Sequence, residues 1–443
     1  MKMLFIRDLL GAVLGAALAT TVSAGCSVRS VECVRISADG RTIAYALDEL
    51  MTSGLYPNLS ASWSNDVQVC WCGTKDPGRV YRAPVHHEQG FSPPAATDGV
   101  ADLLFSPDGN RLAIVTSRKV LVLDLASGNI REVFDKPGSC PCASWIGNDE
   151  LGFGAWEPPE DAEKPISGFR LYRARVSETS ALPSTIFTLF PERKAAVSLY
   201  WSPRGRYAFL VPRSGGNVLY DVQRRERVLF QPIQASFGAI AWKKDESAVL
   251  CPRLRPYDGD SNHAREDRTG VGPPTHPAPW PAGSLNPDDP DWVMVGMPDG
   301  NTVELGAHDY AGELEWTADG AYVICRGGWG GIWLIRPAPW AAFPLKDKIV
   351  SAMKLVGNTH ALDLRALPVP GWLWTRGADG RCYAMDYEGR QFIPITEGGA
   401  WAITPDGRRI AEVGRAGEVN VRELALPPPA SSATAATSPE KPK

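Results

Sequence analysis

Residues 105–115 of this 443-residue chain are FSPDGNRLAIV, and the architecture can be worked out from these eleven positions. Ser-Pro-Asp-Gly favours a tight turn, because proline presets φ at the second turn position, aspartate suits the third, and glycine tolerates the positive φ that closes it. An apolar run precedes this turn and another follows it. Two short apolar runs joined by a tight turn predict a β-hairpin.

The same pattern occurs five more times along the chain. The copies are ISADGRTIAYA at 36–46, WSPRGRYAFLV at 201–211, WKKDESAVLCP at 242–252, WTADGAYVICR at 316–326 and ITPDGRRIAEV at 403–413. A second pattern follows several of them: an apolar strand, an acidic residue, a polar turn and another apolar strand. It occurs at 121–134, 218–230 and 383–395, with a looser copy at 293–305. Each repeat therefore predicts two hairpins, or four strands.

A repeat of about 40 residues with four strands is typical of a β-propeller blade. One blade cannot bury both of its faces, but blades packed in a ring bury each other's. We predict an all-β fold, a single β-propeller over residues 25–426, with eight four-stranded blades and seven as the alternative. The predicted units lie near 33–99, 100–140, 141–196, 197–236, 237–312, 313–356, 357–398 and 399–426.

Three units are longer than a blade requires, and we expect loop insertions near 47–99, 156–168 and 253–291. The last unit shows only three strands, so we expect its fourth to come from the segment Ser27–Cys33. Aromatic residues end the first strand of most units, where we expect them to pack between blades. They are Phe105, Trp145, Trp201, Trp242, Trp316 and Trp401.

The first 24 residues have the pattern of a signal peptide. Lys2 and Arg7 precede an apolar run at 9–22 that is shorter than the roughly 20 residues needed to cross a bilayer. Val22-Ser23-Ala24 is a small-x-small cleavage site, and an uncleaved anchor is the alternative. The residues before Cys26 resemble a bacterial lipobox, although serine stands where leucine is usual. This resemblance implies lipid attachment at Cys26, with an unlipidated exported chain as the other outcome.

The net charge is −4, with 46 basic and 50 acidic residues, and no basic stripe is present. We therefore expect no nucleic-acid partner. Residues 427–443 lack large aliphatic side chains and are predicted to be disordered. The run Arg224-Arg225-Glu226-Arg227 falls in a predicted turn, where solvation accounts for it.

Nine cysteines are present, and eight could pair if Cys26 is lipidated. In an exported protein we expect disulfides, with the close pairs Cys70/Cys72 and Cys140/Cys142 as candidates and the connectivity open. Cys251, Cys325 and Cys382 lie in apolar runs and could instead be small buried hydrophobic residues.

The hairpins at 105–115 and 403–413 resemble the WD-type repeat of TolB-like propellers. That resemblance implies a bacterial envelope protein, periplasmic or attached to the cell envelope, that binds other proteins. It supplies no functional residue. We expect a monomeric, non-catalytic scaffold whose partner is an envelope protein or glycan, with Tyr257, Trp280 and Trp292 as interface anchors. The alternative for these aromatics is that they fix the 253–291 loop to the ring.

An enzymatic function is the alternative. Oligogalacturonate lyases are similar propellers that hold a metal through histidines, and six histidines are present here: His86, His87, His263, His276, His308 and His360. Their spacing matches no metal motif, and the stretch from Asp258 departs from the calcium-loop pattern at its sixth and twelfth positions. We therefore assign no catalytic, cofactor or metal residue.

Overall fold

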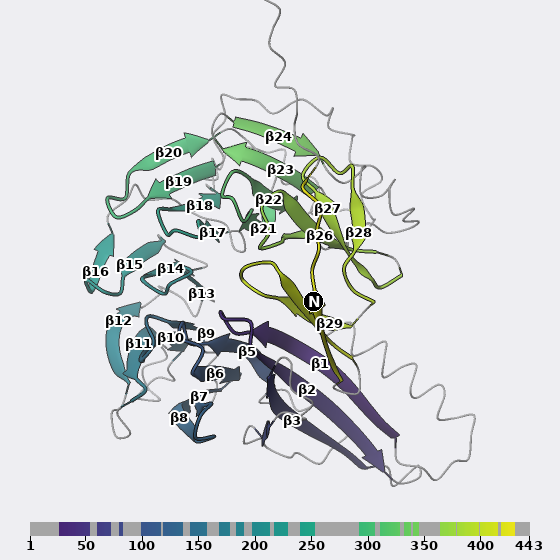
Figure 1. Ribbon diagram of the computed structural model, residues 1–443. Coiled ribbons are helices and arrows are strands. Elements are labelled where there is room, and N and C mark those ends of the chain that lie inside the picture. Colours follow the sequence, from purple (N-terminus) through teal and green to yellow (C-terminus); the bar gives the residue numbers. More distant parts are fainter. Residues whose placement is uncertain are drawn as a thin grey trace, which may run out of the picture.

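The fold was examined in a computed structural model. It describes residues 26–53, 60–71, 79–82, 99–116, 118–135, 142–156, 168–177, 183–189, 197–212, 217–228, 240–252, 292–305, 311–327, 332–337, 340–344, 364–377, 379–397, 399–414 and 418–429. All regular elements in these ranges are β-strands, and they form eight antiparallel sheets arranged around a ring (Figure 1). The eight-bladed propeller predicted from the hairpin repeats is therefore confirmed.

Each blade is built from strands that are consecutive in sequence. Blade 1 contains β1 (Cys26–Ile36), β2 (Thr42–Ser53), β3 (Ser60–Trp71) and β4 (Arg79–Arg82). Blade 2 contains β5 (Val100–Phe105), β6 (Arg111–Thr116), β7 (Lys119–Asp124) and β8 (Ile130–Asp135). Blade 3 contains β9 (Cys142–Trp145), β10 (Glu150–Trp156), β11 (Phe169–Arg175) and β12 (Ser184–Leu189).

The next three blades repeat this order. Blade 4 contains β13 (Val197–Trp201), β14 (Tyr207–Pro212), β15 (Val218–Asp221) and β16 (Glu226–Val228). Blade 5 contains β17 (Ala241–Trp242), β18 (Ala248–Pro252), β19 (Trp292–Gly296) and β20 (Thr302–Leu305). Blade 6 contains β21 (Ala311–Trp316), β22 (Val323–Gly327), β23 (Ile332–Pro337) and β24 (Trp340–Pro344).

The last two blades complete the ring. Blade 7 contains β25 (Leu364–Ala366), β26 (Trp372–Arg376), β27 (Cys382–Asp386) and β28 (Phe392–Pro394). Blade 8 contains β29 (Ala400–Ile403), β30 (Arg409–Val413) and β31 (Val419–Glu423). In Figure 1 the first strands β9, β13, β17 and β21 lie toward the middle of the ring, and the fourth strands β12, β16, β20 and β24 lie at its rim.

The turn chemistry explains why the hairpins form. In blade 2 the Ser106 N–H donates to Arg111 O at 2.9 Å and the Gly109 N–H donates to Ser106 O at 2.8 Å. The Ser106 hydroxyl donates to Asp108 Oδ1 at 2.5 Å and accepts from the Arg111 N–H at 3.0 Å. Equivalent bonds form around Ser37, Thr317 and Thr404, with Asp39, Asp319 and Asp406 in the place of Asp108. The hydroxyl and the carboxylate thus satisfy the backbone of the turn locally.

The hydrophobic core lies between the blades. Eight clusters of buried side chains are present among the described residues, and each joins two neighbouring blades. All six predicted aromatics belong to such a cluster or pack against it. In each case the aromatic residue comes from the later of the two blades that the cluster joins. The expected inter-blade packing of these residues is confirmed, because an isolated sheet would expose both of its faces to water.

The expected source of the missing strand in blade 8 was wrong. Ser27–Cys33 belongs to β1 and pairs with β2 inside blade 1, for example Val31 with Leu47. Among the described residues the ring closes instead by face packing. Val34, Ile43 and Tyr45 of blade 1 are buried against Ala411 and Val413 of blade 8. The Arg409 guanidinium also donates to Asp39 O at 3.5 Å across this seam.

Blade 1 is longer than the others. β1, β2 and β3 have 11, 12 and 12 residues, and they extend beyond the ring as a ribbon (Figure 1). Part of the stretch at 47–99 that we expected to be a loop is therefore strand, because residues 48–52 pair with both β1 and β3. The expected insertion at 253–291 lies outside the described residues, as does the one near 156–168 apart from its two end residues. The signal segment also lies outside them, as does the predicted tail 427–443 from residue 430 onward.

Candidate functional site

The ring has two different faces, because strand connections alternate between the ends of a meandering sheet. The links from first to second strand and from third to fourth emerge on one face, which we call the turn face. The links from second to third strand and from one blade to the next emerge on the other, which we call the loop face. The hairpin turns that begin at Ser37, Ser106, Ser202, Lys243, Thr317 and Thr404 all lie on the turn face, where turns of adjoining blades contact one another.

The segments longer than a blade requires all leave and re-enter the sheets at the loop face. Ser53 pairs with Ser60, Trp156 pairs with Phe169, and Pro252 pairs with Trp292. In each case the two strand ends that flank the long segment are directly opposite each other. The segments from Arg82 to Val100 and from Pro344 to Leu364 join blades and so also belong to this face. Sequence variation in segment length is therefore concentrated on one side of the ring.

The predicted site residues are not brought together in the described part of the chain. Cys26 is the first residue of β1 and pairs with Thr52, at the outer end of the blade 1 ribbon. Trp292 is the first residue of β19, between Pro252 and Leu305. Tyr257 and Trp280 lie outside the described residues, as do all six histidines and the stretch from Asp258.

Within the described ranges, no group of three or more His, Cys, Asp and Glu side chains is placed to hold a metal ion. A helix with the length and apolar character needed to span a membrane is also absent from those ranges. A shallow pocket of about 360 Å³ opens on the turn face of blade 8, lined by Asp406, Arg408, Arg409, Glu423, Leu424 and Ala425.

Six cysteines have described side chains, and no disulfide joins any two of them. Cys251, Cys325 and Cys382 are buried, which confirms that they act as small core residues. Burial raises the pKa of the Cys251 thiol to about 12. The expected disulfides find no support in the described residues, and the side chains of Cys72 and Cys140 lie outside them.

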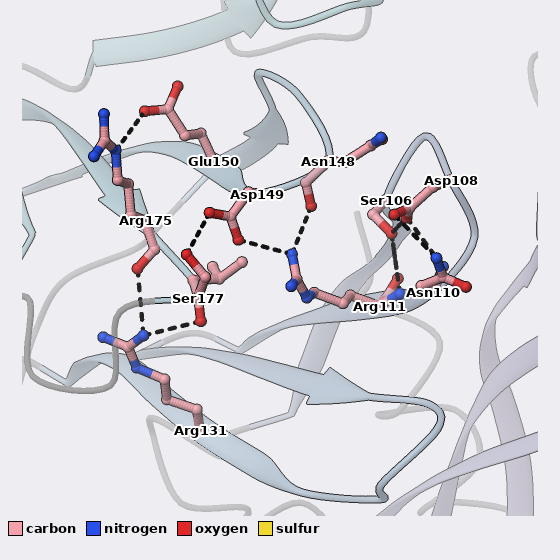
Figure 2. Close-up of polar contacts among 11 residues, drawn as sticks. Ser106, Asp108, Asn110, Arg111, Arg131, Asn148, Asp149, Glu150, Arg175 and Ser177 are labelled. Carbon is pink, nitrogen blue, oxygen red and sulfur yellow. Dashed lines mark hydrogen bonds and ion pairs between the residues drawn. The ribbon is translucent and has the colours of Figure 1, made fainter.

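A polar network lies on the turn face between blades 2 and 3 (Figure 2). The Arg111 guanidinium donates to Asn148 O and to Asp149 Oδ1, both at 2.9 Å. Arg131 donates to the carbonyl oxygens of Arg175 and Val176 at 3.3 and 3.0 Å. Both arginines therefore bridge from blade 2 to turns of blade 3. Because each cation is matched by acceptors, this network fixes the two blades relative to each other and leaves little charge for a ligand.

The turn carboxylates are held in their ionised form. The hydrogen bond from Ser37 lowers the pKa of Asp39, and the hydrogen bond from Thr404 lowers the pKa of Asp406. Each carboxylate also accepts a backbone N–H two residues later, at 3.0 Å. Hydrogen bonds to a carboxylate favour its charged form. The turn face consequently carries a regular set of anionic positions, one in each standard turn.

Blade 4 departs from this pattern in a way that the sequence analysis missed. Its turn is Ser-Pro-Arg-Gly, so Arg204 stands where the other turns have aspartate. Glu246, from the equivalent turn of blade 5, supplies a carboxylate to this turn instead. Its Oε1 accepts from Ser202 Oγ and from the Arg204 N–H, both at 2.6 Å. Glu246 is only 8% exposed and has a φ of 62°, at the position where other turns have glycine. The sequence did contain a signal, since both turns depart from the repeat.

Together, the ring, the blade-to-blade core and the two faces define an eight-bladed β-propeller, and propellers are among the solved structures to which it is similar. No protein-family model matches the sequence, and no curated protein matches it. The chain is similar to the Dos1 propeller, with 12% identity and a TM-score of 0.52, over 88% of this chain and 92% of that one.

Two further solved structures are similar at lower scores. One is a chain of the Mitotic Checkpoint Complex, with 13% identity and a TM-score of 0.43, over 75% of this chain and 93% of that one. The other is the Cps50 (Swd1) β-propeller domain of Myceliophteria thermophila, with 14% identity and a TM-score of 0.42, over 80% and 96%. At such identities the likeness to the Dos1 propeller shows the fold alone.

Proposed function

We propose that this protein is an exported, non-catalytic β-propeller scaffold that binds a protein partner through its loop face. The observation that carries the proposal is the location of the long segments. Ser53 with Ser60, Trp156 with Phe169, and Pro252 with Trp292 place three of them on one face of a rigid ring. Segments of variable length on a rigid scaffold are the usual place for binding residues.

The fold suits this role because it needs no titratable site. Several segments from different blades can contact one partner at once, and aromatic residues dominate such interfaces. Tyr257 and Trp280 belong to the segment between Pro252 and Trp292, so we assign the anchoring contacts to these aromatics and to Trp292. The resemblance of the hairpins to the repeat of TolB-like propellers implies an envelope protein as partner, and we propose this class of partner here, in the periplasm or cell envelope.

The proposed attachment point is Cys26. It begins β1, and β1 enters the ring from the loop-face end. A lipid on Cys26 would hold the protein by the outer end of the blade 1 ribbon. Mass spectrometry of the mature chain tests this directly, since a diacylated N-terminal cysteine and an unmodified N-terminus differ in mass.

The binding proposal is tested by replacing residues 253–291 with a short Gly/Ser hairpin between Pro252 and Trp292, whose direct pairing makes such a turn geometrically feasible. A partner captured from envelope extract with the full protein is identified, purified and titrated against both proteins by calorimetry. We expect the replacement to weaken binding at least tenfold with an unchanged melting temperature. Equal affinity for both proteins would remove this segment from the interface. A tightly bound metal together with unsaturated product from uronic oligosaccharides would instead establish the lyase alternative.

A further inference from the structure

A second surface, on the opposite face of the ring, is formed by three adjoining turns of blades 4 and 5. These turns are residues 202–207 and 221–226 of blade 4 and residues 243–248 of blade 5. The first and third are joined by the hydrogen bond from the Arg204 N–H to Glu246. The first and second are joined by the Val222 N–H, which donates to Arg206 O at 2.9 Å, and by the ion pair of Arg206 with Asp221 at 3.1 Å. We call this surface the basic turn patch.

Positive charge accumulates on this patch. Its exposed cations are Arg204, Arg224, Arg225, Arg227 and Lys244, and its exposed acids are Glu226 and Asp245. Arg224 lies 3.6 Å from Glu226, and the Arg227 guanidinium lies 5.0 Å from the centre of the Phe187 ring. No ion pair within the described part of the chain involves the side chains of Arg204, Arg225 or Lys244. These three cations are therefore available to a ligand.

The charge arises from an inversion of the turn pattern. Five other turns present an aspartate at the position of Arg204, namely Asp39, Asp108, Asp245, Asp319 and Asp406. In blade 4 the hydroxyl of the turn serine donates instead to Glu246, which is buried and also accepts from the Arg204 N–H. The acceptor carboxylate is thus buried, and a cation stands at the exposed turn position.

The backbone conformation of Arg225 is one that favours glycine, and the arginine there has no evident structural role. Among the described residues, Arg225 and Glu246 are the two that combine a side chain with positive φ, at 59° and 62°. Blades 2 and 5 have Gly128 and Gly300 at the position of Arg225. A left-handed conformation is unfavourable for any residue with a Cβ. Glu246 is explained by its bonds to blade 4, whereas Arg225 makes no ion pair in the described part that would explain it.

We propose that the basic turn patch binds an acidic protein segment, rich in aspartate or glutamate, through Arg204, Arg225 and Lys244. Guanidinium groups donate paired hydrogen bonds to carboxylates, and the three turns hold the cations in a fixed arrangement. A short segment fits better than a long polyanion, because the neighbouring turns along this face present the anions of Asp108, Asp149 and Asp319. This surface lies opposite the loop face, so the proposal does not depend on the scaffold function.

The test uses a fluorescein-labelled peptide of aspartate and glutamate residues, titrated with the full protein by fluorescence anisotropy. The double variant Arg225→Glu/Lys244→Glu is compared with the matched variant Arg41→Glu/Arg408→Glu, which changes the same net charge on exposed turns of blades 1 and 8. We expect the first to weaken binding about tenfold or more and the second by less than about twofold, since close ion pairs dominate at moderate salt.

A third variant guards against misfolding. Arg225→Gly removes one cation at a position where glycine suits the backbone, so it should keep or raise the melting temperature while weakening peptide binding severalfold. Equal effects of the two double variants would show that only net charge matters and would overturn the proposal. So would the absence of peptide binding by the unaltered protein, or binding of a polyphosphate or oligonucleotide probe in its place.

Discussion

The indole N–H of Trp145, in blade 3, donates a hydrogen bond to the carbonyl oxygen of Leu104, in blade 2, at 2.8 Å. Two other tryptophans reach back in the same way: Trp201 donates to Cys142 O at 3.2 Å and Trp316 to Ala241 O at 3.0 Å. In each case the donor ends the first strand of one blade and the acceptor lies in the first strand of the preceding blade. These hydrogen bonds restrict how neighbouring blades are oriented, because their geometry is more specific than that of the hydrophobic contacts around them.

Trp145→Phe should lower the free energy of unfolding by roughly 1–2 kcal/mol, because the part-buried Leu104 carbonyl loses the indole donor. Trp242→Phe is the matched control, since the Trp242 Nε1 is buried without a partner in the described part and its ring stacks on Tyr207 at 5.8 Å. Urea unfolding of both variants measures the difference. Equal losses would show that the hydrogen bond contributes nothing beyond ring packing.

Glu246 supplies a carboxylate to a turn that has Arg204 in place of aspartate. Substitutions at these two positions should therefore have strongly non-additive effects on the free energy of unfolding. Glu246→Gly should destabilise by about 1–3 kcal/mol, because Ser202 Oγ and the Arg204 N–H lose a charged acceptor. Arg204→Asp alone should also destabilise, since it adds a second carboxylate beside Glu246. The double variant restores the standard turn, with aspartate and glycine at their usual positions, and should recover most of the loss. Additive free energies in the four-protein cycle would contradict this account.

Two glycines with similar φ should respond differently to a methyl group. Gly205 and Gly320 have φ of 70° and 66°. A Cβ on Gly205 would lie 2.3 Å from Trp145 O, whereas a Cβ on Gly320 would meet nothing within 4 Å. Gly320→Ala should therefore cost only the backbone strain, about 1 kcal/mol, and Gly205→Ala clearly more. Thermal unfolding of the two variants measures the difference in melting temperature. Similar decreases would contradict the close contact between Gly205 and Trp145 at the interface of blades 3 and 4.

Stability should fall in acid partly through the turn carboxylates. The pKa of Asp39 and of Asp406 is lowered in the folded protein, so their ionised forms favour folding. Their contribution is present above the unfolded pKa near 3.9 and is lost as pH falls through the folded pKa. The variant Asp39→Asn/Asp406→Asn should show a shallower loss of urea midpoint between about pH 5 and pH 3. An identical slope for both proteins would rule out this contribution.

The Cys251 thiol should resist labelling until the protein unfolds. It is fully buried, and burial raises its pKa to about 12, so little thiolate forms near neutral pH. Alkylation followed by peptide mapping should find Cys251 unmodified in native conditions and modified in concentrated urea. Rapid native labelling of Cys251 would mean that blade 5 opens locally.

The blades could be predicted from the sequence because hairpin turns are local. Ser106, Asp108 and Gly109 make their hydrogen bonds within six residues, so the sequence of one repeat is enough to predict its hairpin. The pairing of Glu246 with Ser202 could not be predicted in this way, because it joins residues 44 positions apart in two different blades. The placement of Ser27–Cys33 failed for a related reason: an apolar strand pattern does not specify which of two neighbouring sheets it joins. No periodic pattern covers Tyr257 or Trp280, so their roles stayed predictions.

The seam between blades 8 and 1 is closed, in the described part of the chain, by Val34, Ile43 and Tyr45 packing on Ala411 and Val413 rather than by an exchanged strand. Every hydrogen-bonded ladder therefore belongs to one uninterrupted stretch of sequence. A circular permutant cut between any two blades would preserve all of these ladders, and the ring has no obligatory first blade.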